Sequence, residues 1–173
     1  EALALRDPLT GLGNRRVLDA KLRRIFARPP IARQDTAVII CDVDGLKDVN
    51  DNLGHAAGDA VLLEAADALR LAVAGIVDAT VCRIGGDEFC VVIDGGGLLQ
   101  AEPVAERAQR LFARIDTRSM SCGIAIATIN MHTPGDLLRA ADEAQYLQKR
   151  QRRGLAVVPG EEVDHPRRRY RDR

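Results

Sequence analysis

Residues 80–93 have the sequence Thr-Val-Cys-Arg-Ile-Gly-Gly-Asp-Glu-Phe-Cys-Val-Val-Ile, and the fold can be worked out from this stretch. Apart from Arg83, residues 80–84 and 89–93 are apolar or β-branched, which is the pattern of two short strands. The four residues between them, Gly-Gly-Asp-Glu, can form a tight turn. The stretch therefore predicts a β-hairpin with an acidic tip.

A second acidic strand end lies earlier in the chain. Residues 37–41 form a short apolar run typical of a strand buried on both faces, and Asp42-Val43-Asp44 follows directly. If this strand neighbours the hairpin, its carboxylates converge with those at the tip. Converging carboxylates are what Mg²⁺ requires, because it takes oxygen ligands and completes its shell with water and substrate phosphates.

Either acidic cluster alone would more often be a solvated turn. Two nearby features favour a site for a phosphorylated ligand instead. Lys47 lies just past Asp42 on a short predicted helix, where both the side chain and the N-terminal amides can bind phosphate. Gly85 and Gly86 have no Cβ, so a nucleotide can lie close to the backbone of the hairpin tip.

Cap and turn signals place the other elements. Gly54 is expected to end the short helix, Gly58-Asp59 to open a longer one, and Pro103 to lie in the first turn of the next. The remaining expected elements are a helix capped by Asn14, a strand over 119–128, a helix opened by a capping box at 133–136, and a strand over 155–158.

The order β-α-α-β-β-α-β-α-β predicts an α/β fold, a ferredoxin-like sandwich with a mostly antiparallel central sheet and surrounding helices. We expect one domain over residues 1–158, in which 1–6 end an upstream linker helix. Residues 159–173 are charged, lack apolar periodicity, and are expected to form a disordered tail.

Composition excludes several classes of protein. The 25 basic and 25 acidic residues cancel, so no broad positive field would attract nucleic acid. No apolar run is long enough to span a membrane, and a cytoplasmic location is expected, although an upstream membrane region is compatible with this sequence. The cysteines lie in apolar, strand-like stretches without metal-site spacing, so buried, reduced thiols are expected.

The motifs of the chain agree in order and spacing with one known family. Arg83-Ile-Gly-Gly-Asp-Glu-Phe89 resembles the signature of the GGDEF family of diguanylate cyclases. Further segments resemble the family's other motifs, and together they span roughly residues 5–158: Asp7-Pro-Leu-Thr-Gly-Leu-Gly-Asn-Arg15, Asp42-Val-Asp-Gly-Leu-Lys-Asp-Val-Asn-Asp51, Gly54-His-Ala-Ala-Gly-Asp59, Ser121-Cys-Gly-Ile-Ala125 and Ala141-Asp-Glu-Ala-Gln-Tyr-Leu-Gln-Lys-Arg150. The resemblance implies a palm-like fold shared with nucleotide cyclases and polymerases.

The resemblance also implies a reaction and its residues. Two GTP molecules would be condensed into cyclic di-GMP and two pyrophosphates, with Mg²⁺ or alternatively Mn²⁺ as the cofactor. Asp42, Asp87 and the carbonyl of Val43 would hold the metal, and Glu88 would help to deprotonate the attacking 3′-hydroxyl. The residues implied to bind substrate are Asn50 and Asp59 at the guanine edge, Lys47, Lys149 and Arg153 at the phosphates, and Gly85 and Gly86 against the nucleotide.

The implied partners are GTP, cyclic di-GMP, a second copy of the domain for catalysis, and an upstream sensory domain. Two other functions stay open: a degenerate domain that binds GTP without turnover, and a structural or dimerising module with solvated acidic turns. Four positions depart from the family pattern. Gly45 stands where a bulkier residue is frequent, Gln145 and Gln148 where small or apolar residues are usual, and Arg152 where glycine is usual.

Overall fold

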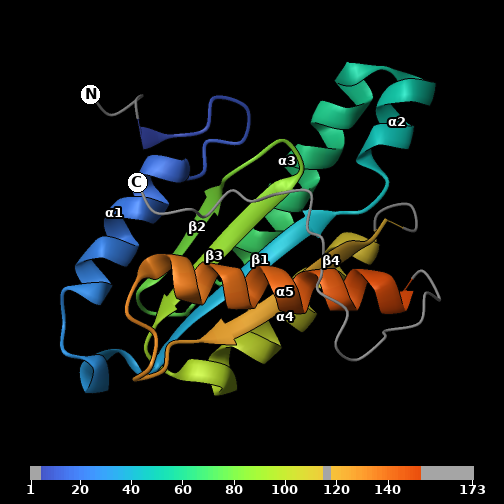
Figure 1. Cartoon of the computed structure of the whole chain (residues 1–173). Helices are drawn as coiled ribbons and strands as arrows, with labels where there is room; N and C mark the ends of the chain where they lie inside the picture. Colours follow the sequence, from blue (N-terminus) through green and yellow to red (C-terminus); the bar gives the residue numbers. More distant parts are fainter. Residues whose placement is uncertain (1–4, 115–117, 153–173) are drawn as a thin grey trace.

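The computed structural model describes residues 5–114 and 118–152, which form a four-stranded sheet with helices on both faces (Figure 1). The strands lie in the order β2-β3-β1-β4, and every neighbouring pair is antiparallel. The strand bounds are β1 (Thr36–Val43), β2 (Ala79–Arg83), β3 (Glu88–Asp94) and β4 (Met120–Ile126). The predicted α/β sandwich with an antiparallel sheet is confirmed.

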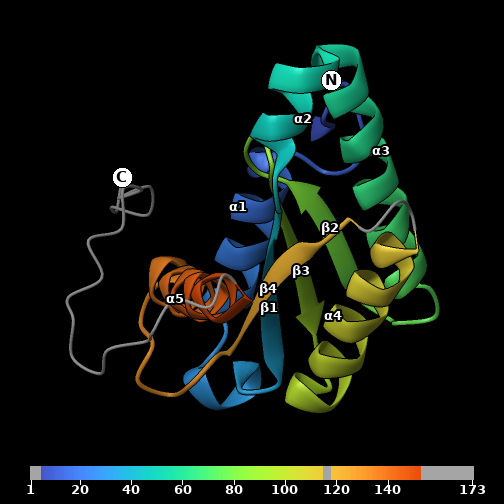
Figure 2. The same cartoon turned by 90° about the vertical axis from the view of Figure 1, so that its right-hand side faces the viewer.

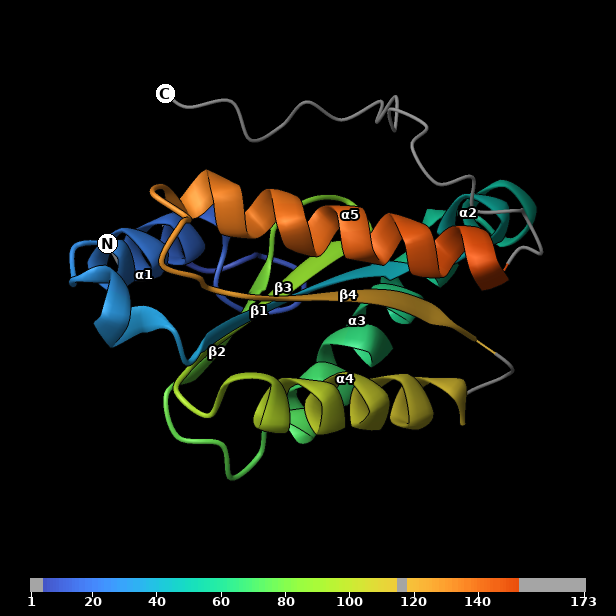
Figure 3. The same ribbon diagram turned by 60° about the horizontal axis from the view of Figure 1, so that its bottom comes forward.

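Two pairs of helices cover the sheet. Figures 2 and 3 show α1 and α5 on one face, and α3 and α4 on the other. The short α2 follows β1 and lies beyond the end of that strand (Figure 1). The helix bounds are α1 (Arg15–Phe26), α2 (Leu46–Leu53), α3 (His55–Ala72), α4 (Gly97–Ala113) and α5 (Pro134–Arg152), with a 3₁₀ turn η2 (Pro30–Arg33) before β1.

Strand β1 lies in the middle of the molecule and separates two hydrophobic cores. All of its residues are buried, as the continuous apolar run predicts. Because side chains alternate across a strand, Ile39 and Cys41 pack in the core under α3 and α4, whereas Val38 and Ile40 pack in the core under α1 and α5. Asp42 continues the second series and therefore lies on the α5 face.

Helix α5 packs closely on the edge strand β4 at Gly123. A Cβ at this position would overlap the carbonyl oxygen of Ala141 and the amide nitrogen of Gln145. These are backbone atoms of α5, so no side-chain rotation could make room for it. The glycine therefore sets the distance between α5 and the sheet.

Helix α3 starts earlier than the sequence predicts. It begins at His55, whereas Gly58-Asp59 was expected to open it. Gly54, at a φ of 83°, both ends α2 and precedes α3, so a single residue makes the turn. Gly58 lies inside α3, where the Asn50 side chain packs against it. A Cβ at this position would overlap the amide of Asn50, which explains why the residue is a glycine.

The predicted start of α4 was also wrong. The helix begins at Gly97, so Pro103 lies in its interior and not in its first turn. Gly95, Gly96 and Gly97 all have positive φ and form the turn that opens the helix. Proline leaves the carbonyl four residues earlier without its helical donor, but Leu99 at that position is 89% exposed and water can replace the donor.

The predictions for the cap of α1 and for the cysteines are confirmed. Asn14 caps α1 by accepting from the amides of Arg16 and Val17, and all four cysteines are free and buried, as expected. Arg6, in the expected linker segment 1–6, pairs with Gly13 in an isolated bridge. The predicted strand over 155–158 and the tail over 159–173 lie outside the described residues. Within the described part of the chain, no helix is both long and apolar enough to cross a membrane.

Candidate active site

The antiparallel pairing of β1 with β3 brings the two acidic strand ends together. Asp42 lies directly opposite Glu88, and the Val43 amide donates to the Asp87 carbonyl oxygen at 3.0 Å. Directly opposite residues point to the same face of a sheet, so the Asp42 and Glu88 side chains share the α5 face. Both are buried, Asp42 at 5% exposure and Glu88 at 9%. The convergence expected from the sequence is thus confirmed.

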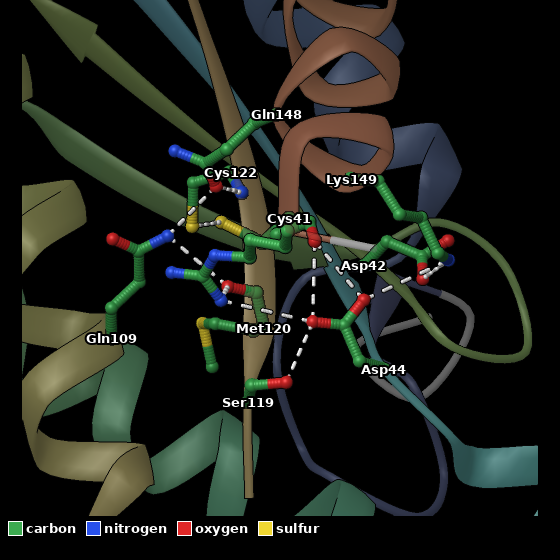
Figure 4. Close-up of polar contacts among 11 residues, drawn as sticks. Cys41, Asp42, Asp44, Gln109, Ser119, Met120, Cys122, Gln148 and Lys149 are labelled. Atoms are coloured by element: carbon green, nitrogen blue, oxygen red, sulfur yellow. Dashed lines mark hydrogen bonds and ion pairs between the residues drawn. The ribbon is translucent and has the colours of Figure 1, made fainter. Parts of the chain in front are cut away.

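Asp42 is the most deeply buried carboxylate of this group. Burial raises its pKa above the ordinary value, the hydrogen bond and charge of Lys149 act in the opposite direction, and the negative charges of Asp87 and Asp44 raise it further. Lys149, near the end of α5, donates from Nζ to Asp42 Oδ1 (Figure 4). The end of α5 therefore supplies a cation to a carboxylate cluster on the sheet.

Asp44 is fixed by two serines, Ser119 just before β4 and Ser121 within it, a contact that the sequence interpretation missed. Ser119 Oγ donates to Asp44 Oδ2 at 2.8 Å, and Ser121 Oγ donates to Oδ1 at 3.0 Å (Figure 4). Two cations of α5 lie near the same carboxylate: Lys149 Nζ at 3.9 Å and Arg152 Nη1 at 3.8 Å. Residues that are two positions apart in an extended segment point to the same face, so Ser119 and Ser121 could be expected to lie together. Their contact with Asp44 follows only from the β1–β4 register.

Gln148, one of the two glutamines that depart from the family pattern, has a structural role at the edge of the sheet. Cys122 of edge strand β4 points its amide away from β1, and Gln148 Oε1 accepts from it at 2.7 Å. Gln109 of α4 donates to the same Oε1 at 2.9 Å and to the Met120 carbonyl at 3.1 Å (Figure 4). Arg152 also donates to that carbonyl, at 2.9 Å. These polar side chains form hydrogen bonds with backbone groups of β4 that an edge strand would otherwise leave unpaired.

The glycine hairpin is braced from outside by an ion pair. Arg83 donates from Nη2 to the Gly86 carbonyl at 2.8 Å and from Nη1 to Asp7 at 3.2 Å. Burial, the largest effect, raises the pKa of Asp7, but hydrogen bonds from Thr10 and Arg83 outweigh it and lower the pKa overall. At Gly86 a Cβ would meet no protein atom within 4 Å, so the fold itself does not require a glycine there.

The residues expected at the guanine base lie on the two helices that follow β1. The Asn50 side chain of α2 packs on Gly58 of α3, next in sequence to Asp59, which is exposed. Lys47, in the first turn of α2, is also exposed. Asn50 and Asp59 are therefore near one another, whereas no described contact joins them or Lys47 to the carboxylates. Arg153 lies outside the described residues.

The donor set fits a hard divalent cation, although it is small. Across residues 5–114 and 118–152, no three His, Cys, Asp or Glu side chains are grouped as a metal site. The predicted set comprises only two carboxylates, Asp42 and Asp87, with the Val43 carbonyl. All three are oxygen donors, and the negative charges of Asp44 and Asp87 next to buried Asp42 favour an added cation. Mg²⁺ commonly keeps such an incomplete protein shell and takes further oxygens from water and phosphates.

Comparisons with known proteins agree with this arrangement. The family model of the diguanylate cyclase GGDEF domain matches residues 4–154. An uncharacterised protein from the hutH 5′ region of Streptomyces griseus is 36% identical over 165 residues, which cover 91% of this chain and 67% of that protein. The diguanylate cyclase TpbB of Pseudomonas aeruginosa is 36% identical over 172 residues, which cover 93% of this chain and 38% of TpbB.

A solved structure leads to the same family. The GGDEF domain of PA1120 (TpbB or YfiN) from Pseudomonas aeruginosa superposes with a TM-score of 0.75 at 34% identity, covering 84% of this chain and 89% of that one. The present chain thus corresponds to about one domain of the longer TpbB, of which it spans 38%. The chain belongs to the GGDEF family of diguanylate cyclase domains.

Proposed function

We propose that this domain condenses two molecules of GTP into cyclic di-GMP, with the release of two pyrophosphates. The observation that carries the proposal is the meeting of Asp42, Asp87 and Glu88 where β1 and β3 pair, in a chain of this family. A cluster of carboxylates beside a lysine suits phosphoryl chemistry, because catalysis there depends mainly on positioning and on charge stabilisation.

Each residue has a distinct part in the proposed reaction. Asp42, Asp87 and the Val43 carbonyl would hold Mg²⁺ or Mn²⁺, which when bound supplies charge stabilisation at the attacking hydroxyl and the leaving pyrophosphate. Glu88, buried on the same face as Asp42, would accept the proton of the ribose 3′-hydroxyl. Gly86 would leave room for the nucleotide against the hairpin backbone.

The other contacts of GTP come from the helices. Asp59 and Asn50 would bind the guanine edge, since a carboxylate can accept from both N1–H and the exocyclic amine. Lys47, Lys149 and Arg153 would bind the phosphates. This arrangement predicts a preference for GTP over ATP, because the adenine edge would leave polar groups unpaired.

One domain supplies one half of the reaction. The product contains two guanylates, each joined through its 3′-oxygen to the phosphate of the other, whereas the residues above form a single nucleotide site. We infer that two protomers meet with their sites facing one another. The parts of a longer protein outside this chain would bring the protomers together and carry the sensory control.

Substitutions at the hairpin tip test whether Asp87 acts as a metal ligand and Glu88 as a general base. We expect Asp87→Asn to abolish product formation in a folded domain, because it removes a metal-binding charge and no core contact. Glu88→Gln should lower turnover by about 10²–10⁴-fold, the range typical of a lost general base, while GTP affinity falls much less. Turnover would be followed by chromatography of the products, and affinity by calorimetry.

The control is Asp67→Asn, which changes an aspartate that is 69% exposed on α3 and paired with Arg70. It should leave turnover unchanged. Product formation by folded Asp87→Asn would refute the ligand assignment, and a loss of GTP affinity in Glu88→Gln equal to its loss of turnover would refute the base assignment. Wild-type domain that binds GTP but forms no product would instead identify a degenerate signalling module.

A further inference from the structure

Lys149 is hydrogen-bonded to Asp42, the carboxylate that the proposed function assigns to the metal. Its Nζ donates to Asp42 Oδ1, although the two residues are 107 positions apart in sequence. The Lys149 side chain is 22% exposed and that of Asp42 only 8%. A carboxylate this buried is costly without a nearby positive charge, and Lys149 provides that charge in the structure.

A second carboxylate lies within reach of the same ammonium group. Asp44 Oδ1 is 3.9 Å from Lys149 Nζ, and Figure 4 shows Lys149 with both aspartates. Asp44 does not depend on the lysine for its position, because Ser119 and Ser121 donate to its two oxygens. Lys149 could therefore leave Asp42 and still face a fixed negative charge.

A divalent cation at Asp42 and the ammonium group of Lys149 compete for the negative charge of the same carboxylate. Their like charges also repel each other across so short a distance. We propose that Lys149 is an internal cation that neutralises Asp42 when no divalent metal is bound, and that the metal must displace it toward Asp44. The inference rests on the proposed function, because that function places the metal at Asp42.

The displacement gives Lys149 two successive roles. In the metal-free domain it compensates the buried charge of Asp42. After metal binding it stands beside Asp44, free of Asp42 and available to a phosphate of GTP. Metal loading and phosphate binding would in this way be coupled through one side chain of α5.

Metal affinity without nucleotide tests this competition. Mn²⁺ would be titrated into the domain at pH 8 and free Mn²⁺ measured by electron paramagnetic resonance, for wild type, Lys149→Met and Lys47→Met. We expect Lys149→Met to bind Mn²⁺ about tenfold or more tightly than wild type, because a hydrogen bond to a charged group no longer competes. Lys47→Met removes an exposed positive charge of α2 and should change the affinity by less than about threefold.

Thermal unfolding provides a second readout on the same proteins. In chelator, Lys149→Met should melt at a lower temperature than wild type, since Asp42 has lost its partner, and Mn²⁺ should raise its Tm more than that of wild type. The double variant Asp42→Asn with Lys149→Met should lose the gain in Mn²⁺ affinity. Folded Lys149→Met that binds Mn²⁺ no more tightly than wild type, or not at all, would overturn the proposal, as would an equal gain in Lys47→Met.

The outcome is separate from that of the proposed function. If wild type makes cyclic di-GMP but Lys149→Met gains no Mn²⁺ affinity, the competition fails and the cyclase assignment stands. If Lys149→Met gains affinity through Asp42 but wild type makes no product from GTP, the competition stands and the cyclase assignment fails.

Discussion

Gly86 and Gly123 both lack a side chain, but an added methyl group would have opposite consequences at the two positions. At Gly123 the methyl group would overlap backbone atoms of α5, whereas at Gly86 it would meet no protein atom within 4 Å. Neither glycine has a positive φ, so alanine can adopt both backbone conformations. The fold therefore requires a glycine at position 123 but not at position 86.

Alanine substitutions should separate these two needs. We expect Gly123→Ala to lower the free energy of unfolding by about 1–3 kcal/mol, the usual cost of overpacking a core. Gly86→Ala should leave this free energy within about 0.5 kcal/mol of wild type but weaken GTP binding. Urea denaturation and calorimetry would measure the two effects, and unaltered GTP affinity in Gly86→Ala would argue against a nucleotide at the hairpin.

At the scale of residues, local signals located the carboxylates but not their partners. Asp42, Asp87 and Glu88 follow or precede apolar runs, so their place at strand ends is visible in the sequence. The role of Ser121 and the contact of Lys149 with Asp42 depend on the pairing of distant elements, which no local pattern encodes. Gln148 appears in the sequence only as an exception, and its role follows from the free edge of β4.

Helix α5 begins with a reciprocal cap that has a measurable pH dependence. Asp136 accepts from the amides of His132 at 3.0 Å and Thr133 at 2.9 Å, and its own amide donates to Thr133 Oγ1 at 3.3 Å, which confirms the predicted capping box. The backbone hydrogen bond from Thr133 is the main cause that lowers the pKa of Asp136 to about 2. The ionised carboxylate therefore stabilises the folded state.

Removal of this cap should destabilise the domain only where Asp136 is ionised. We expect Asp136→Ala to lower the free energy of unfolding by about 1 kcal/mol at pH 7. A lowered pKa gives stability that is fully present above the unfolded value of 3.8 and is lost as the pH falls toward about 2. Urea denaturation at pH 7, 5 and 3 would follow the difference from wild type, which should shrink at pH 3.

The control for this series is Asp67→Ala, in which an exposed aspartate of α3 is removed from a surface ion pair. Its effect at pH 7 should be smaller, because exposed pairs contribute little. A difference between Asp136→Ala and wild type that stays as large at pH 3 as at pH 7 would show that the cap does not act through the charged carboxylate.

At the scale of elements, the hairpin and the capping box were predictable because all of their signals lie within a few residues. The starts of α3 and α4 were not. Gly58 looked like a helix start, but it is a packing site for Asn50, and Pro103 looked like a first-turn proline although three glycines before it already open the helix. A contact between two helices thus explains Gly58, whereas an earlier glycine turn explains the start of α4.

At the scale of the whole molecule, the site depends on a strand order that local patterns do not reveal. The central place of β1 between β3 and β4 brings the acids at the end of β1 and the start of β3 together with the serines at the start of β4. The same order lets α5 cross the sheet so that its C-terminal part supplies Lys149 (Figure 3). From the sequence, the carboxylates were expected to converge only if the two strands are neighbours. The order of elements predicted a ferredoxin-like antiparallel sheet, and the resemblance to the family implied a palm-like fold.

We propose that two such domains together convert GTP into cyclic di-GMP. The most direct test is the rate of product formation from GTP and Mg²⁺, with the product identified by mass spectrometry, over a series of domain concentrations. We predict that cyclic di-GMP forms and that the rate per protomer rises with concentration, because mass action populates the two-protomer complex. Absence of cyclic di-GMP at every concentration would contradict the claim, and a rate per protomer that stays constant from demonstrably monomeric samples upward would contradict the two-protomer mechanism.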